Sequence, residues 1–199
     1  MTIPEPGPAV PRRGNAFSQA LGAWMLRVLG WTLEGEFPNV PKAVMVAAPH
    51  TSNWDGAITL GTVLAMRLNI HWMGKDTMFR WPFGRLLRWM GGIPVDRSTG
   101  RGLVQTTIDK FAENPHYIVL ISPEGTRSAT REWKTGFYKI AHGADVPIVL
   151  AYIDFARKVV GFGPLVRASG DTEREMQDIR GFYNDKVARH SGRFEKHAE

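Results

Sequence analysis

Short apolar runs alternate along this chain with longer stretches in which apolar residues recur every three or four positions. The short runs are typical of buried strands, and the wider spacing is typical of amphipathic helices. The runs that predict strands cover residues 31–37, 43–48, 70–73, 93–95, 117–121, 146–153 and 158–166. The stretches that predict helices cover residues 16–30, 57–68, 79–90, 103–111, 136–142 and 176–187. Because strands and helices alternate, we expect a single α/β domain over residues 16–199, with a mostly parallel (mixed) sheet flanked by helices.

The first 30 residues divide into two parts. Residues 1–15 contain four prolines and two glycines, so we expect a flexible N-terminal tail without a regular element. The amphipathic helix expected over residues 16–30 carries an apolar stripe made of Phe17, Leu21, Trp24, Met25 and Val28, which Trp31 continues. Such a stripe either packs on the core or lies in the interface of a lipid bilayer, and the pattern leaves both interpretations open.

Composition narrows the class of protein. The chain has 199 residues, of which 43% are hydrophobic, as in a globular domain with a full core. The absence of cysteine excludes disulfides, thiolate metal sites and a cysteine nucleophile, and it suits a cytoplasmic protein. No apolar segment approaches the roughly 20 residues of a membrane span, and no secretion signal is expected at the N-terminus. The net charge of +6 favours anionic partners such as phosphates, nucleic acid or anionic lipid surfaces.

Polar residues stand directly after four of the predicted strands. Because the carboxyl ends of parallel strands meet at one edge of a sheet, where ligands bind in α/β proteins, we expect these residues to gather there. An imidazole, carboxylates and cations in one place suit a negatively charged substrate. The candidate site residues are His50, Asp55, Lys75, Arg97, Glu124, Gly125, Thr126 and Arg127.

Each of these residues also has a plainer structural interpretation. Asp55 could cap the helix that follows it, and taken alone the His50–Asp55 pair is more often a cap than a site. Residues 124–127 could form a turn with a solvated arginine. Asp96 and Arg97 could form a surface ion pair, which contributes little to stability. The position of all these segments at strand ends favours a site.

Other classes of function fit the residues less well. The chain has neither the Gly-x-Ser-x-Gly pattern of serine hydrolases nor the His-Glu-x-x-His pattern of zinc hydrolases. Residues 75–101 hold six cations, two acids and interleaved aromatic residues, which suits a solvated basic face, an anionic membrane or nucleic acid. A nucleic-acid partner would leave the loops of His50 and Glu124 without a role, so we expect no nucleic acid.

Four motifs in order resemble those of the glycerolipid acyltransferase superfamily, typified by 1-acylglycerol-3-phosphate acyltransferases. The His-x-x-x-x-Asp motif is similar to His50–Asp55, and the glycine-led segment ending in Asp-Arg is similar to residues 92–97. Residues 123–128 match Pro-Glu-Gly-Thr-Arg-Ser in full, and residues 146–148 match Val-Pro-Ile. The resemblance covers roughly residues 43–153, and four motifs in order are far more specific than one.

The resemblance implies an O-acyltransferase of phospholipid biosynthesis. Its substrates would be an acyl-CoA or acyl-carrier-protein thioester and a lysophospholipid or glycerol-phosphate hydroxyl, with conversion of lysophosphatidate to phosphatidate favoured. The implied catalytic residues are His50 as general base and Asp55 as its partner. The implied substrate-binding residues are Lys75, Arg97, Glu124, Gly125, Thr126 and Arg127.

No metal and no cofactor besides the thioester co-substrate is implied. A lipid substrate further predicts peripheral attachment to an anionic membrane surface at the cytoplasmic face, without a transmembrane span. Three alternatives stay open from the sequence: a thioester hydrolase, a remodelling acyltransferase acting on another lysolipid, and an anionic-lipid-binding module without catalysis.

Overall fold

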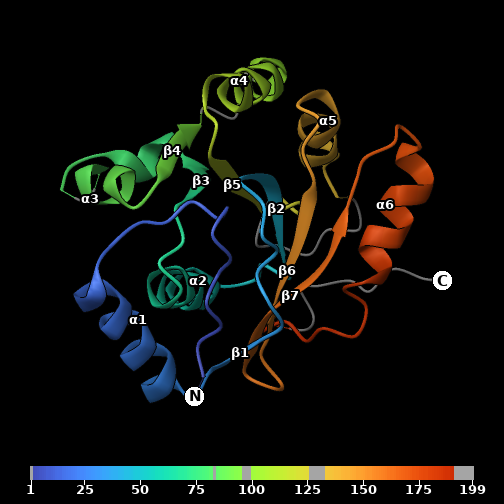
Figure 1. Cartoon of the computed structure of the whole chain (residues 1–199). Helices are drawn as coiled ribbons and strands as arrows, with labels where there is room; N and C mark the ends of the chain where they lie inside the picture. Colours follow the sequence, from blue (N-terminus) through green and yellow to red (C-terminus); the bar gives the residue numbers. More distant parts are fainter. Residues whose placement is uncertain (1, 83, 96–99, 126–132, 191–199) are drawn as a thin grey trace.

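A seven-stranded sheet forms the centre of the protein, which we describe from a computed structural model for residues 2–82, 84–95, 100–125 and 133–190 (Figure 1). The strands lie in the order β1-β7-β6-β2-β5-β3-β4. Their bounds are β1 (Thr32–Glu34), β2 (Lys42–Ala48), β3 (Ile70–Lys75), β4 (Gly92–Val95), β5 (Tyr117–Ile121), β6 (Ile148–Asp154) and β7 (Val159–Val166). Neighbouring strands are parallel except β6 and β7, which are antiparallel. The predicted α/β class with a mostly parallel, mixed sheet is therefore confirmed.

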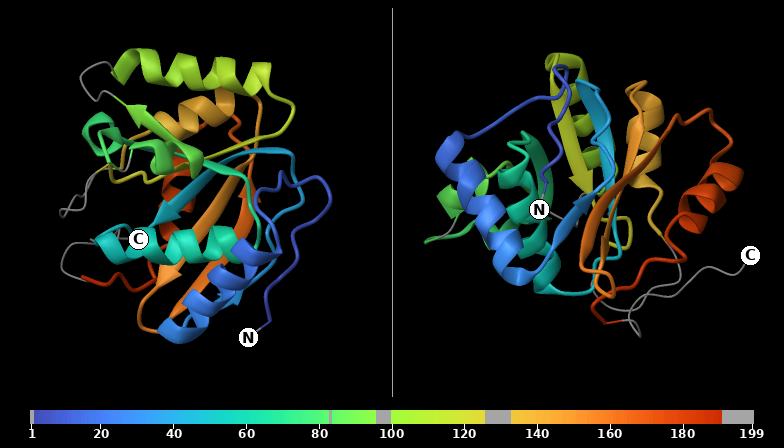
Figure 2. Two further views of the ribbon diagram at one scale, coloured as in Figure 1. Left: turned by 90° about the vertical axis from the view of Figure 1, so that its left-hand side faces the viewer. Right: turned by 60° about the horizontal axis from the view of Figure 1, so that its bottom comes forward.

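Helices cover both faces of this sheet (Figures 1 and 2). Their bounds are α1 (Ala16–Leu29), α2 (Asn53–Ala65), η1 (Asp76–Phe79), α3 (Gly84–Trp89), α4 (Gly100–Glu113), α5 (Gly136–Gly143) and α6 (Thr172–Gly181). Residues of α4, α5 and α6 join one core cluster, and residues of α1 and α2 join clusters on the opposite face. Among the described helices, none is long and apolar enough to cross a membrane.

The central strand β2 shows why the sequence forms a buried parallel sheet. Val44 and Val46 pack into the cluster with α4 to α6, whereas Ala43 and Met45 pack into a cluster on the other face. Side chains alternate between the faces of a strand, and helices cover both faces here, so both sets of positions are apolar. This burial fixes β2 in the middle of the sheet and brings its carboxyl end to the loop that begins after Ala48.

Residues 2–15 differ from the flexible tail that the sequence predicted. Val10 is only 3% exposed and belongs to a core cluster. The Arg13 N–H donates to the Arg67 carbonyl at 2.8 Å, and the Asn69 N–H donates to the Pro11 carbonyl at 2.9 Å. Prolines prevent a helix here, but they leave an extended segment that can pair with the loop between α2 and β3.

The helix α1 turns its predicted apolar stripe outward. The buried residues of α1 are Gly22 and Leu26, and α1 packs closely against α2. A Cβ at Gly22 would lie 2.4 Å from the backbone nitrogen of Ala65, so the glycine permits this close approach. Phe17 is 77% exposed, and Trp24 and Val28 are also exposed. The core-packing interpretation is therefore wrong for these three residues, whereas Trp31, just after α1, is buried in a core cluster.

Exposed apolar and basic residues stand on α1, α2 and α3 and on the segment before α3. Figure 2 (left) shows the ribbons of these three helices on one side of the protein. We call these residues the apolar–basic surface. Its apolar members are Phe17, Leu21, Trp24, Val28, Trp54, Met78, Trp81, Leu86 and Trp89. Its basic members, on η1 and α3 or next to them, are Arg80, Arg85 and Arg88. Trp81 is 93% exposed, which is unusual for a residue that gains so much from burial.

Candidate active site

His50 and Asp55 lie together where the chain passes from β2 to α2. The Nδ1 atom of His50 is 3.3 Å from the Oδ2 atom of Asp55. The His50 side chain is 27% exposed, whereas that of Asp55 is 2% exposed. An imidazole within reach of solvent, held from behind by a buried carboxylate, has the arrangement of a general base with its orienting partner.

Asp55 also caps the helix α2. Its carboxylate accepts hydrogen bonds from the backbone N–H groups of Thr51 at 2.7 Å and Ser52 at 2.8 Å. The Ser52 hydroxyl donates to the same carboxylate at 2.8 Å. Burial raises the pKa of Asp55, but the hydrogen bonds from His50 and Ser52 outweigh burial and leave this pKa below its ordinary value. The cap and the pair with His50 are therefore compatible, because the helix start holds an ionised carboxylate beside the imidazole.

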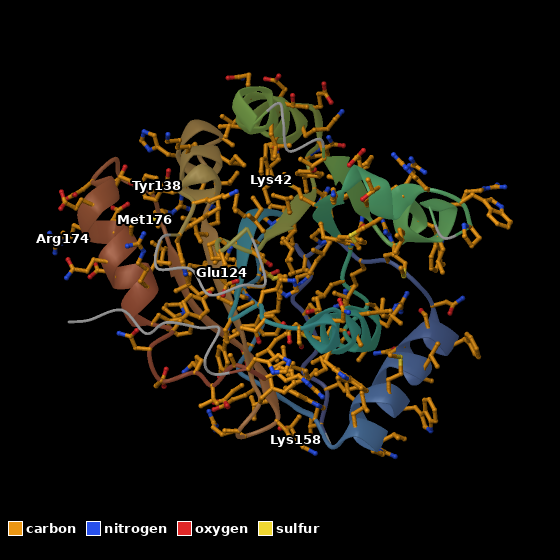
Figure 3. The ribbon with its side chains drawn as sticks, turned by 180° about the vertical axis from the view of Figure 1, so that it is seen from behind. Lys42, Glu124, Tyr138, Lys158, Arg174 and Met176 are labelled. Carbon is orange, nitrogen blue, oxygen red and sulfur yellow. The ribbon has the colours of Figure 1, made fainter. Side chains whose placement is uncertain are left out.

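Glu124 reaches the same loop from the end of β5. Its carboxylate accepts the His50 backbone N–H, with oxygens at 3.0 and 3.2 Å from the nitrogen. Glu124 is 6% exposed, and Figure 3 shows it near the middle of the molecule. Burial raises the pKa of Glu124 to about 7, although the hydrogen bond and charge of His50 act in the opposite direction. These two hydrogen-bond distances show that the Glu124 carboxyl group directly contacts the backbone of the His50 loop.

The turn after Glu124 requires glycine at position 125. Gly125 has φ +62, and a Cβ there would lie 2.9 Å from the Lys134 side chain. The Lys134 N–H donates to the Pro123 carbonyl at 2.9 Å and closes this part of the loop. Glycine adopts this left-handed backbone conformation without steric strain, whereas the Cβ of any other residue would crowd the Lys134 side chain.

Of the remaining predicted site residues, the structure describes Lys75, at the same carboxyl edge of the parallel strands as the ends of β2 and β5. Lys75 is exposed at the end of β3, and β5 lies between β3 and β2 in the sheet. Arg97, Thr126 and Arg127 lie outside the described residues. Within the described part of the chain, no group of three or more His, Asp and Glu side chains could hold a metal ion.

The C-terminal residues contribute contacts that the sequence did not reveal. The predicted helix over residues 176–187 ends at Gly181, and the chain turns back toward the site. The buried Tyr183 hydroxyl donates to the carbonyls of Val46 at 3.1 Å and Ala151 at 3.2 Å. The His190 N–H donates to the Thr51 hydroxyl at 3.3 Å. The only sequence signal was the apolar spacing that includes Tyr183, and it predicted a helix instead.

Comparison with known proteins shows the family of this chain and a solved structure with a similar fold. The family model described as Acyltransferase matches residues 33–154, which include His50, Asp55 and Glu124. The chain is similar to the crystal structure of the 1-acyl-sn-glycerophosphate (LPA) acyltransferase PlsC from Thermotoga maritima, with a TM-score of 0.58 and 18% identity. That similarity covers 81% of this chain and 73% of the Thermotoga chain. No curated protein matches the chain significantly. Because the family model covers more than half of its length, the chain belongs to the acyltransferase family, and it is an acyltransferase enzyme.

Proposed function

We propose that this enzyme transfers a fatty acyl group from a thioester to a hydroxyl of a lysophospholipid or glycerol phosphate. Lysophosphatidate is the favoured acceptor, and acyl-CoA or acyl-carrier protein is the donor. The observation that carries the proposal is the 3.3 Å contact between His50 Nδ1 and Asp55 Oδ2 at the carboxyl end of β2. The similar Thermotoga protein is a 1-acyl-sn-glycerophosphate acyltransferase, which supports this choice of acceptor.

The proposed reaction is a direct transfer without a covalent acyl-enzyme. Asp55 accepts a hydrogen bond from Nδ1–H of His50, so the lone pair on Nε2 takes the hydroxyl proton as the acceptor oxygen attacks the thioester carbonyl. The new carbon–oxygen bond forms, the carbon–sulfur bond breaks, and the imidazolium returns its proton to the departing sulfur. General-base assistance of this kind contributes about 10²–10⁴ in rate.

The proposal also assigns parts to the predicted substrate-binding residues. Arg97 and Lys75 bind the acceptor phosphate, and Thr126 and Arg127 contact the substrate. Glu124 has a different part, because its carboxylate holds the His50 backbone N–H at 3.0 Å. It orients the catalytic loop, and Gly125 supplies the turn that follows Glu124.

The apolar–basic surface supports peripheral attachment to a membrane. Exposed aromatic residues favour the interface between lipid and water, and neighbouring arginines favour anionic headgroups. The proposed location is the cytoplasmic face of a membrane. Co-sedimentation with vesicles of anionic or zwitterionic lipid measures this attachment. The variant Trp24→Ser with Trp81→Ser should bind anionic vesicles less tightly, whereas binding equal to wild type would contradict attachment through this surface.

The reaction is tested by following thiol release from acyl-CoA with and without lysophosphatidate. Release that depends on the acceptor, together with formation of phosphatidate, is the expected result. The variant His50→Ala should lose turnover while its unfolding midpoint stays unchanged, and the exposed histidine in His116→Ala provides the control. Activity retained by His50→Ala would remove His50 from the mechanism.

The same assay separates the alternatives. Thiol release without dependence on an acceptor would indicate a thioester hydrolase. Release that depends on another lysolipid would indicate a remodelling acyltransferase. Vesicle binding without any thiol release would indicate a lipid-binding module and would overturn the catalytic proposal.

A further inference from the structure

The nine residues after α6 form a segment, residues 182–190, that we call the C-terminal strap. It lies beyond residues 33–154, the part of the chain that matches the family model. Hydrogen bonds of three of its residues fix it beside the candidate site. Tyr183 donates to carbonyls of β2 and β6, Val187 accepts the Phe155 N–H at 2.9 Å, and the His190 N–H donates to Thr51. Thr51 stands between His50 and Ser52, so the strap ends against the catalytic loop itself.

Within this strap, Arg189 lies against two aromatic rings from other parts of the chain. Its guanidinium carbon is 5.0 Å from the ring centre of Trp54 and 5.8 Å from that of Phe155. Trp54 lies in the first turn of α2, directly before Asp55. An arginine above an aromatic face is oriented by the ring while its N–H groups stay available at the edge of the guanidinium plane.

The charges near Arg189 leave a role for a negatively charged ligand. Arg189 is exposed, and among the described residues no carboxylate lies within ion-pair distance of it. A guanidinium beside the His50 loop meets the requirements of phosphate recognition, because the planar fork of arginine matches two phosphate oxygens.

We propose that Arg189 binds a phosphate group of a substrate at the His50–Asp55 site. This inference rests on the proposed acyl transfer. It adds to that reaction a substrate-binding residue that lies outside the family motifs. The phosphate belongs either to the glycerol-phosphate acceptor or to the coenzyme A or phosphopantetheine part of the donor. Both sources present the same chemistry to a guanidinium, and kinetics with each substrate varied in turn distinguish them.

The kinetic test compares Arg189→Ala and Arg189→Lys with wild type. The control is Arg174→Ala, an exposed arginine on the outer side of α6 (Figure 3). Loss of a charged hydrogen bond to phosphate should raise one KM about 10–100-fold in Arg189→Ala, while kcat and the unfolding midpoint stay near wild type. Arg189→Lys keeps the positive charge but lacks the planar guanidinium group. Its KM should therefore lie between that of wild type and that of Arg189→Ala. A raised acceptor KM assigns the phosphate to the acceptor, and a raised donor KM assigns it to the donor.

The outcome that overturns the inference is equally direct. If both KM values of Arg189→Ala equal those of wild type and Arg174→Ala, Arg189 binds no substrate phosphate. A lower kcat with unchanged KM values would also contradict phosphate binding and would indicate that the strap supports the loop.

A binding experiment keeps this test separate from the proposed reaction. Calorimetry with glycerol 3-phosphate and with coenzyme A measures affinity without turnover. Weaker binding of one of them to Arg189→Ala supports the inference even if wild-type protein shows no acyl transfer, whereas equal affinities for both would overturn it.

Discussion

The buried carboxyl group of Glu124 should make the stability of this enzyme depend on pH, and Glu124→Gln isolates that dependence. The carboxylate holds the His50 N–H, yet Glu124 is only 6% exposed. Burial raises its pKa from 4.5 to about 7. Glutamine keeps the size of the side chain and an oxygen that can accept the same N–H, but it cannot ionise.

The direction of the effect follows from the proton that the folded state retains. Between pH 4.5 and 7, folded protein keeps a proton on Glu124 that the unfolded chain releases, so the free energy of unfolding falls as pH rises. A tenfold change in proton affinity is worth about 1.4 kcal/mol. The ionised carboxylate therefore destabilises the folded protein by roughly 3 kcal/mol above pH 7. Below pH 4.5 this contribution disappears.

Urea unfolding at pH 5 and pH 8 measures this difference. At pH 5 the free energies of unfolding of wild type and Glu124→Gln should be similar. At pH 8 the variant should be more stable, by up to roughly 3 kcal/mol. The control is Glu36→Gln, because Glu36 is exposed and its replacement should have the same small effect at both values of pH.

One result would refute this reasoning. If wild type and Glu124→Gln lose stability in parallel between pH 5 and pH 8, the burial of Glu124 does not control its protonation. Activity gives a second check, since Glu124→Gln keeps an acceptor for the His50 N–H and Glu124→Ala does not. Glu124→Ala should therefore show the larger loss of kcat, and equal losses would contradict the proposed contact.

Three further substitutions test the site and its support. Asp55→Asn removes the carboxylate that holds His50, so kcat should fall by about 10²–10⁴ with little change in KM; an unchanged kcat would exclude the pair from catalysis. Gly22→Ala places a Cβ 2.4 Å from the Ala65 nitrogen, so the free energy of unfolding should fall by about 1–3 kcal/mol in urea; a more stable variant would contradict this close packing. Tyr183→Phe loses hydrogen bonds to two carbonyls of the sheet, which should lower the free energy of unfolding by about 1–2 kcal/mol; equal stability would mean that these bonds contribute nothing.

The sequence predicted the strands well because both faces of the sheet are buried. Residues 117–121 were predicted as a strand and form β5 with the same bounds. The run of residues 43–48 forms most of β2. Both have apolar residues at every position, which the covered faces of a parallel sheet require. The His50–Asp55 pair also followed from the sequence, since the short loop between the end of β2 and the start of α2 leaves little freedom between the two residues.

Elements whose surroundings decide their role were predicted less well. The spacing of Phe17, Trp24 and Val28 indicated an amphipathic helix, but only the packing of Gly22 against α2 shows that this stripe faces outward. The prolines of residues 1–15 suggested a flexible tail, but the segment finds backbone partners in the loop after α2. In both cases the local sequence determined the backbone conformation, but it did not determine which other parts of the protein the segment contacts.

By itself, the sequence determined the α/β class, the positions of most strands, and a histidine and a carboxylate at the end of one of them. Only the tertiary structure decided that Glu124 holds the backbone of His50, 74 residues away, and that the C-terminal strap reaches Thr51. The physical reason is the order of strands in the sheet. The spacing of apolar residues indicates which side of an element is buried. It does not indicate which strands lie beside β2, because that depends on packing over the whole chain. The strands beside β2 bring the residues of the site together.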